Sequence, residues 1–213
     1  LDVKGAQTGK HYELTAAVSA GIEKIEKMVI APLASTLDAV NVMTFDFFGA
    51  WNANGPTAHQ SALFPWTGMP STPPLNNFYS DFAIQEWKRR LIPANKLVMA
   101  LPFYGRGWTG VPNINNGLNQ SATGPAPGAF PEEPGNNSYR NLIQLGYPQF
   151  RDPQSQTFWL YNGSTFWTLD DPVVISNKAA YVKSQGLGGM MFWNLTDDTP
   201  NGALINAIFN GLR

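Results

Sequence analysis

Residues 40–51 read VNVMTFDFFGAW, an almost wholly apolar and aromatic stretch with a single acid, Asp46, near its middle. Its apolar part predicts a buried strand over residues 39–46, which places the carboxylate at the strand's end. An unpaired carboxylate in apolar surroundings is strongly destabilising or has a shifted pKa. We therefore expect Asp46 to have charged partners or to serve a function.

The composition excludes several classes of protein. The 213 residues include no cysteine, which excludes disulfide frameworks, thiolate metal sites and cysteine nucleophiles. The two histidines, His11 and His59, are too few for a multi-histidine metal site. The net charge is -1 and no basic patch is present, which argues against nucleic acid as a partner. No apolar run reaches the ~18 residues of a membrane span, and no signal peptide opens the sequence, so a secretion signal would lie outside it.

Aromatic residues are frequent and charged residues are few. The chain has 7 Trp, 7 Tyr and 13 Phe, while charged residues make up 14%. The usual charged share is about 25%. This balance is common in proteins that bind neutral carbohydrate, because the C–H faces of sugars stack on aromatic rings. A bulky β-rich core gives the same count, so the composition alone leaves both interpretations open.

The order of apolar and amphipathic segments predicts an α/β fold with right-handed crossovers. Each predicted strand is a near-continuous apolar run, as in a parallel sheet covered on both faces. Helical patterns lie between the strands and after the last one. The strands are predicted over 13–17, 39–46, 96–103 and 189–195, and the helices over 21–33, 78–91, 173–184 and 203–212.

A segment rich in Gly, Pro and Asn, residues 105–170, separates the third strand from the third helix. Within it, Asn162-Gly163-Ser164 joins two aromatic runs and predicts a hairpin in a small antiparallel domain. A (β/α)8 barrel needs ~250 residues, and the roughly 150 left without this insert suffice for four βα units. The length predicts half a barrel or a small open sheet, and the exposed edges of such a sheet must pair with something.

Polar and aromatic residues cluster where the predicted strands end. In parallel α/β folds the site lies at the carboxyl ends of the strands. One rim should therefore gather Asp46, Trp51, Tyr104, Arg106 and Trp193, a possible platform for a neutral sugar. The alternatives are that a single ring belongs to the core, and that Asp46 and Arg106 form a purely structural ion pair.

Two further acid pairs have simpler explanations. Asp170-Asp171 precedes Pro172 and is expected to start a helix, since acids favour the first turn. Asp197-Asp198 is expected to lie in a solvated turn.

Four motifs resemble the last four barrel strands of family 18 glycoside hydrolases, the chitinases. HYELTAAVSAG resembles the fifth strand, VMTFDFFGAW the sixth, LVMALPFYGRGWTG the seventh and GLGGMMFWNL the eighth. The aromatic insert resembles the α+β insertion domain of one chitinase subgroup. The resemblance covers nearly the whole chain, in order. It implies a TIM-type (β/α)8 barrel of which residues 1–104 supply strands 5–7, residues 105–170 the insertion domain, and residues 171–213 the last helices and strand 8.

The resemblance also implies roles for individual residues. Trp193 would form the floor of the subsite where the bond breaks, and Trp51 would stack a sugar on the leaving-group side. Asp46 would contact the N-acetyl group. Met43, Tyr104 and Arg106 would line the same region.

The implied activity of the complete protein is hydrolysis of β-1,4-linked N-acetylglucosamine polymers by a substrate-assisted retaining route. Chitin or its oligosaccharides would be the ligand, without metal or organic cofactor, and the protein would be secreted. The family's acidic signature D-x-x-D-x-D-x-E, which carries the general acid, is absent from this chain. We therefore expect the first half of the barrel as a partner and no activity from this chain alone.

Phe45 stands where the family usually has a tyrosine that holds the attacking acetamido oxygen. The loss of that hydrogen bond raises an alternative function, a chitinase-like carbohydrate-binding protein that does not cleave.

Overall fold

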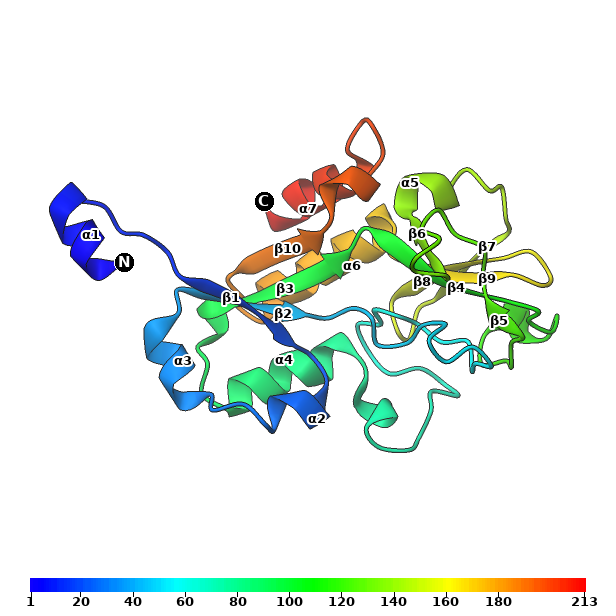
Figure 1. Ribbon diagram of the computed structural model, residues 1–213, viewed down its shortest axis with the longest axis horizontal. Coiled ribbons are helices and arrows are strands. Elements are labelled where there is room, and N and C mark those ends of the chain that lie inside the picture. Colours follow the sequence, from blue (N-terminus) through cyan, green and yellow to red (C-terminus); the bar gives the residue numbers. More distant parts are fainter.

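The computed structural model describes residues 1–213, which form a parallel and an antiparallel sheet (Figure 1). The parallel sheet has the strand order β1-β2-β3-β10. These four strands are half of the eight that close a (β/α)8 barrel, which agrees with the predicted fold. Their bounds are β1 Thr15–Ser19, β2 Ala39–Met43, β3 Leu97–Pro102 and β10 Gly189–Trp193.

Three of the four parallel strands differ from the prediction by two residues or more, and one of them, β10, ends at Trp193 and not at residue 195. β1 begins two residues late, and its parallel register with β2 runs from Thr15 opposite Ala39 to Ser19 opposite Met43. β2 ends at Met43, three residues before Asp46. Asp46 has a φ of 56°, a left-handed conformation incompatible with a strand. Asp46 therefore lies in the turn beyond the strand, where its side chain can be directed independently of the sheet.

Most helices lie beside the parallel sheet, whereas the helix nearest the amino terminus stands apart from it and one short helix lies beside the antiparallel sheet (Figure 1). The single helix predicted over 21–33 is wrong: two short helices form there, because Pro32 lies in the first turn of the second and cannot continue an earlier helix. The other three predicted helices are present within two residues of their expected ends. A short helix near the amino terminus, α1, was not predicted. The helices are α1 Asp2–Thr8, α2 Ile22–Ile25, α3 Ala31–Thr36, α4 Ser80–Arg89, α5 Tyr139–Leu142, α6 Pro172–Ser184 and α7 Ala203–Leu212. Short 3-10 helices cover Leu75–Asn77, Ala94–Lys96, Asn115–Gly117 and Leu195–Asp197. None of these helices combines the length and apolarity needed to cross a bilayer.

The antiparallel sheet has the order β5-β4-β9-β8-β7, with β6 also paired to β4. β4 follows β3 after the single residue Phe103, so Tyr104 and Arg106, which were expected where the third strand ends, lie in a strand of the second sheet. The hairpin at Asn162 is confirmed, since its side-chain oxygen accepts hydrogen bonds from the Ser164 and Thr165 amides. The bounds are β4 Tyr104–Thr109, β5 Gly124–Pro125, β6 Asn136–Ser138, β7 Gln149–Asp152, β8 Thr157–Tyr161 and β9 Phe166–Leu169. The division into domains at 104 and 170 stays a prediction.

The two acid pairs behave differently. Asp171 caps α6 as predicted, accepting a hydrogen bond from the Val174 amide at 3.0 Å. The predicted solvated turn at Asp197-Asp198 is wrong, because the residues are only 5% and 4% exposed. Asp198 is buried because its carboxylate accepts from the first amides of α7, including Ile205 at 2.9 Å. Asp197 has no such partner.

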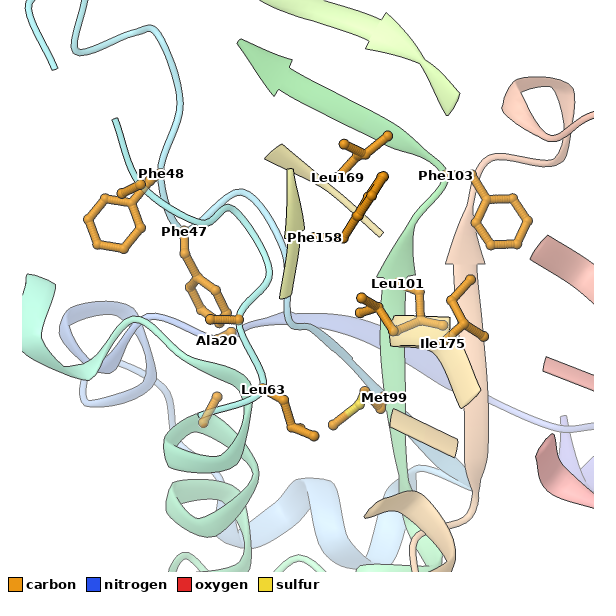
Figure 2. Packing of buried hydrophobic residues seen from close by; sticks show 14 of the residues in the cluster. Ala20, Phe47, Phe48, Leu63, Met99, Leu101, Phe103, Phe158, Leu169 and Ile175 are labelled. Atoms are coloured by element: carbon orange, nitrogen blue, oxygen red, sulfur yellow. The ribbon is translucent and has the colours of Figure 1, made fainter. Parts of the chain in front are cut away.

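One hydrophobic core joins the two sheets. A single cluster of buried residues includes Met99 and Leu101 of β3, Ile175 of α6, and Phe158 and Leu169 of the antiparallel sheet (Figure 2). Because β3 leads directly into β4 and both strands contribute to this cluster, the antiparallel sheet is held firmly at the carboxyl end of the parallel one. This is the end where the predicted site residues lie.

Candidate functional site

The carboxyl ends of the parallel strands surround two cavities that share a wall. The larger, of about 510 Å³, is lined by Met43, Phe45, Asp46, Tyr104, Arg106 and Trp193 together with further residues of both sheets and of the segments that follow or precede their strands. The smaller, of about 340 Å³, contains Trp51 and shares Met43, Phe45 and Asp46 with the larger. The fold thus brings all seven predicted site residues to one place, although their roles there stay predictions.

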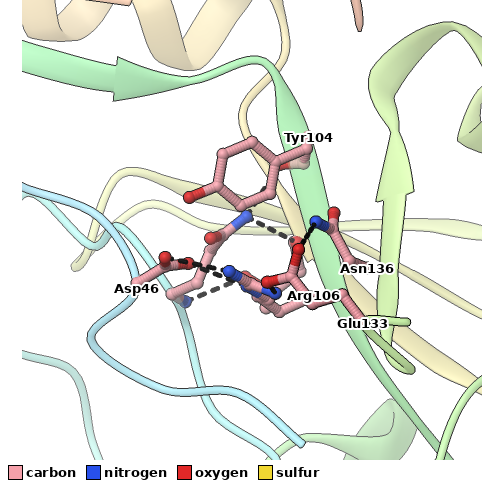
Figure 3. A network of polar contacts seen from close by, with 7 residues as sticks. Asp46, Tyr104, Arg106, Glu133 and Asn136 are labelled. Atoms are coloured by element: carbon pink, nitrogen blue, oxygen red, sulfur yellow. Dashed lines mark hydrogen bonds and ion pairs between the residues drawn. The ribbon is translucent and has the colours of Figure 1, made fainter. Parts of the chain in front are cut away.

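Asp46 and Arg106 form a bidentate ion pair (Figure 3). Arg106 Nε donates to Asp46 Oδ1 at 2.8 Å, and Arg106 Nη2 donates to Asp46 Oδ2 at 2.9 Å. The left-handed backbone of Asp46 turns its side chain toward β4, where Arg106 lies. Paired fork-to-fork contacts of this kind fix geometry as well as charge. The acid in the opening motif therefore has the charged partner that its surroundings require.

Arg106 is buried among aromatic rings. It is 7% exposed, and its guanidinium carbon lies 5.3 Å from the centre of the Trp51 ring and 5.0 Å from that of Tyr104. Burial by itself would lower the pKa of Arg106, but the hydrogen bonds and charge of Asp46 outweigh it and raise the pKa above its ordinary value. Burial, followed by the charge of Asp46, also raises the pKa of Tyr104. The site thus combines a permanent cation with a neutral phenol.

Glu133 completes this network and was not predicted. Arg106 Nη1 donates to Glu133 Oε1 at 2.5 Å, and Asn136 Nδ2 donates to Glu133 Oε2 at 2.7 Å (Figure 3). Burial would raise the pKa of Glu133, yet the hydrogen bonds from Arg106 and Asn136 bring it below the ordinary value. Nothing local in the sequence identifies Glu133. It reaches the site because β6 pairs with β4, with Asn136 opposite Arg106.

The two site tryptophans are exposed, whereas the other five tryptophans of the chain are buried. Trp193 is 61% exposed and Trp51 is 56% exposed. Trp51 folds back over Gly49, where a Cβ atom would lie 2.2 Å from the indole ring. Any side chain at position 49 would therefore require the Trp51 ring to move. Trp87 of α4, by contrast, is fully buried and donates from Nε1 to the carbonyl oxygen of Ser19 at 3.1 Å.

This arrangement suits the binding of a sugar. Exposed indole faces provide stacking surfaces, and a small number of fixed polar groups beside them provide orientation. The carboxylate of Asp46 is engaged on both oxygens by Arg106. It is therefore better placed to orient a bound group than to donate a proton to one.

Known proteins resemble this chain along nearly its whole length. Residues 1–198 match the family described as Glycosyl hydrolases family 18. Chitinase 63 of Streptomyces plicatus is 38% identical over 98% of this chain, which covers 33% of that protein. Chitinase C of Streptomyces lividans is 38% identical over 92% of this chain and 31% of its own length. The chain therefore spans about a third of the curated relatives that it matches.

Solved structures of chitinases have the same fold as this chain. The catalytic domain of chitinase B from Arthrobacter TAD20 superimposes with a TM-score of 0.88 at 30% identity, covering 100% of this chain and 48% of that one. A class V chitinase from Nicotiana tobaccum, solved in complex with NAG4, has a TM-score of 0.86 at 27% identity over 99% of this chain and 59% of that one. The motifs, the fold and these similarities lead to one conclusion: the chain belongs to glycosyl hydrolase family 18.

Proposed function

We propose that the complete protein hydrolyses β-1,4-linked N-acetylglucosamine polymers and that this chain supplies about half of its cleft. The observation that carries the proposal is the larger cavity, where an exposed Trp193 lies beside the Asp46–Arg106 pair at the carboxyl ends of the strands. The chitinases among the relatives support the choice of substrate.

The proposed residue roles are those that the family resemblance implies, and the lining of the two cavities is compatible with them. Trp193 serves as the floor under the sugar whose bond breaks, and Met43 and Tyr104 line the same cavity. Trp51, which lines the smaller cavity, stacks the sugar on the leaving-group side. Asp46, held by Arg106, contacts the N-acetyl group.

In the proposed reaction the acetamido oxygen of the substrate attacks the anomeric carbon. The glycosidic bond breaks, and a glutamic acid protonates the departing oxygen. The acidic signature that would carry this proton donor is not among the 213 residues. The donor therefore belongs to the first half of the barrel, which is the proposed partner of this chain. The edge strands β1 and β10, each paired on one side only, would receive it. The complete protein is proposed to act outside the cell, where chitin is found.

A non-cleaving binding protein is the second candidate, and Phe45 favours it. The Phe45 ring lines both cavities and lies edge-on to Tyr104, with 6.1 Å between ring centres. A phenyl ring offers no hydroxyl to the acetamido oxygen. In the transition state one missing donor costs about 3–4 kcal/mol.

Two measurements test the proposal. The 213-residue chain should leave chitotetraose intact, because general acid catalysis alone contributes about 10² to 10⁴ in rate. Joined behind the first half of the barrel of the Streptomyces plicatus chitinase, it should release shorter oligosaccharides. If the joined protein binds chitotetraose without cleaving it, and Phe45→Tyr restores cleavage, the binding-protein function is correct. If it neither binds nor cleaves, both proposals fail.

A further inference from the structure

The segment after β10 places a buried carboxylate without a partner in the larger cavity. Asp197 is 5% exposed, lines this cavity together with Trp193, and forms no hydrogen bond or ion pair through its side chain. Its oxygens are not among the fully enclosed side-chain atoms that lack a partner, so they are accessible from the cavity. The neighbouring Asp198, in contrast, uses its carboxylate to accept from the first amides of α7. The fold therefore engages Asp198 and leaves the Asp197 carboxylate free for a ligand.

A hydrogen-bond donor would stabilise Asp197 in its ionised form. Burial of a carboxylate without compensation is destabilising. Burial raises the pKa of Asp197, and the positive charge of Arg140 opposes this only in part. A sugar hydroxyl is a suitable donor, because a hydrogen bond to an ionised group is roughly twice as strong as one between neutral groups.

The charges of the cavity oppose an anionic ligand. The lining contains three carboxylates, Asp46, Glu133 and Asp197, and one guanidinium, Arg106, a net charge of -2 when all are ionised. Arg106 is already engaged by Asp46 and Glu133, so it offers no free charge to an anion. Charges interact more strongly in such a partly buried site than in water. The cavity therefore favours ligands with hydroxyl donors and disfavours those with acidic substituents.

The sugar of the proposed function meets these requirements. The unit over Trp193 keeps its acetamido group, which is the nucleophile of the proposed reaction. Inside a β-1,4-linked chain its free hydroxyls are those on the third and sixth carbon atoms. We propose that Asp197 accepts a hydrogen bond from one of these hydroxyls and thereby makes the site select neutral N-acetylglucosamine polymers over acidic derivatives of the same polymer. This inference rests on the proposed function and narrows its substrate class.

Calorimetric titration of the full 213-residue chain with two tetramers tests the inference. One is chitotetraose. In the other, the sixth carbon of every unit is oxidised to a carboxylate, while all acetamido groups are kept. Because every unit carries the acid, the result does not depend on which unit lies over Trp193. The parent chain should bind chitotetraose about tenfold more tightly than the oxidised tetramer, or better.

Asp197→Asn keeps the shape of the side chain and removes its charge. It should weaken binding of chitotetraose by about fivefold, because a hydrogen bond to a charged group becomes one to a neutral group. It should not weaken binding of the oxidised tetramer, because one repelling charge is lost. The ratio of the two affinities should therefore fall by about fivefold or more. Glu132→Gln is the matched control, since it removes one acid next to Glu133 that does not line the cavity, and it should change the ratio by less than about twofold.

Urea unfolding separates a ligand contact from a structural role. Asp197→Asn should be at least as stable as the parent, because it removes a buried carboxylate that has no partner. A variant that is less stable than the parent but has the same affinity ratio would show that Asp197 serves the fold and that the inference is wrong. Asp197→Ser takes the place of Asp197→Asn if that variant does not fold.

The outcomes distinguish the inference from the proposed function. If the parent binds both tetramers equally, or Asp197→Asn leaves the affinity ratio unchanged, the inference is wrong, while the binding of chitotetraose still supports the proposed function. If the parent prefers the oxidised tetramer, both the inference and the neutral polymer of the proposed function are wrong. If the parent binds neither tetramer, the inference is overturned, and cleavage by the joined protein decides the proposed function.

Discussion

Gln60 holds the start of β4 by its side chain: Nε2 donates to the backbone carbonyl oxygen of Tyr104 at 2.7 Å. The same nitrogen lies 3.3 Å from the carbonyl oxygen of Thr168, opposite Arg106 in the neighbouring strand. The backbone carbonyl oxygen of Gln60 accepts from the amide of Phe47, next to Asp46. One fully buried residue thus joins the segments that carry both members of the Asp46–Arg106 pair.

Replacement of Gln60 by leucine should destabilise the chain. The buried carbonyl oxygens of Tyr104 and Thr168 would lose a hydrogen-bond donor. This should lower the free energy of unfolding by about 1–3 kcal/mol. Urea unfolding measures the change. Gln144→Leu is the control, because Gln144 is exposed, and it should stay within about 0.5 kcal/mol of the parent. Equal stability of the two variants would show that the Gln60 side chain does not support the site.

Trp193 and Trp87 should respond in opposite ways to replacement by alanine. Trp193→Ala should leave stability nearly unchanged, since the ring is 61% exposed, and weaken binding of N-acetylglucosamine oligomers by about tenfold. Trp87→Ala should destabilise the fold by about 3–5 kcal/mol, because the ring is fully buried. Its affinity, measured under folding conditions, should remain close to that of the parent. Fluorescence titration and urea unfolding separate the two effects. Unchanged binding by Trp193→Ala would refute the proposed platform.

Much of the fold could be predicted because its signals are local. Apolar runs located all four parallel strands, and an Asn-Gly-Ser turn located the β8–β9 hairpin. The break in the helix expected over 21–33 also has a local signal, since Pro32 cannot continue a helix from the residues before it.

The candidate site was only half visible in the sequence. Residues within three positions of a strand's carboxyl end, such as Asp46 and Tyr104, could be placed, because parallel strands end at one edge. Glu133 and Gln60 could not, since they reach the site through strand pairing and long-range backbone contacts. Asp197 lies four residues beyond the end of β10, and its burial could not be predicted, because an acid after a strand gives no indication of whether it is exposed.

A buried ion pair behind the site should be essential to the fold. Lys178 Nζ lies 2.5 Å from Asp170 Oδ2, and Ser61 Oγ donates to Asp170 Oδ1 at 2.6 Å, with both charged side chains at most 1% exposed. Lys178→Met would leave a buried carboxylate without its cation. This should lower the free energy of unfolding by about 3–5 kcal/mol. The double variant Lys178→Met/Asp170→Asn should recover part of this loss. If the single variant is as stable as the double one in urea, the pair does not contribute as described.

The last prediction concerns acid stability. His59 is fully buried, and the centre of its ring lies 4.9 Å from that of Trp66 and 5.4 Å from that of Trp159. Burial lowers the pKa of His59 to about 3. In the unfolded chain the pKa of histidine is about 6.5, so between these values the unfolded state binds a proton that the folded state does not. The contribution of His59 to stability is therefore complete above about pH 6.5. It falls by about 1.4 kcal/mol per unit as pH decreases toward 3.

Urea unfolding at about pH 7 and about pH 4.5 should accordingly show a loss of about 2–3 kcal/mol that depends on His59. His59→Leu removes the titrating group, so the difference between the two pH values should be smaller in that variant by this amount. Other acids titrate in the same range, and the comparison of variant with parent cancels their contribution. The exposed His11 provides the control: His11→Asn should retain the His59-dependent loss. Parallel pH dependences for the parent and His59→Leu would mean that His59 is protonated in the folded chain, in spite of its burial against two indole rings.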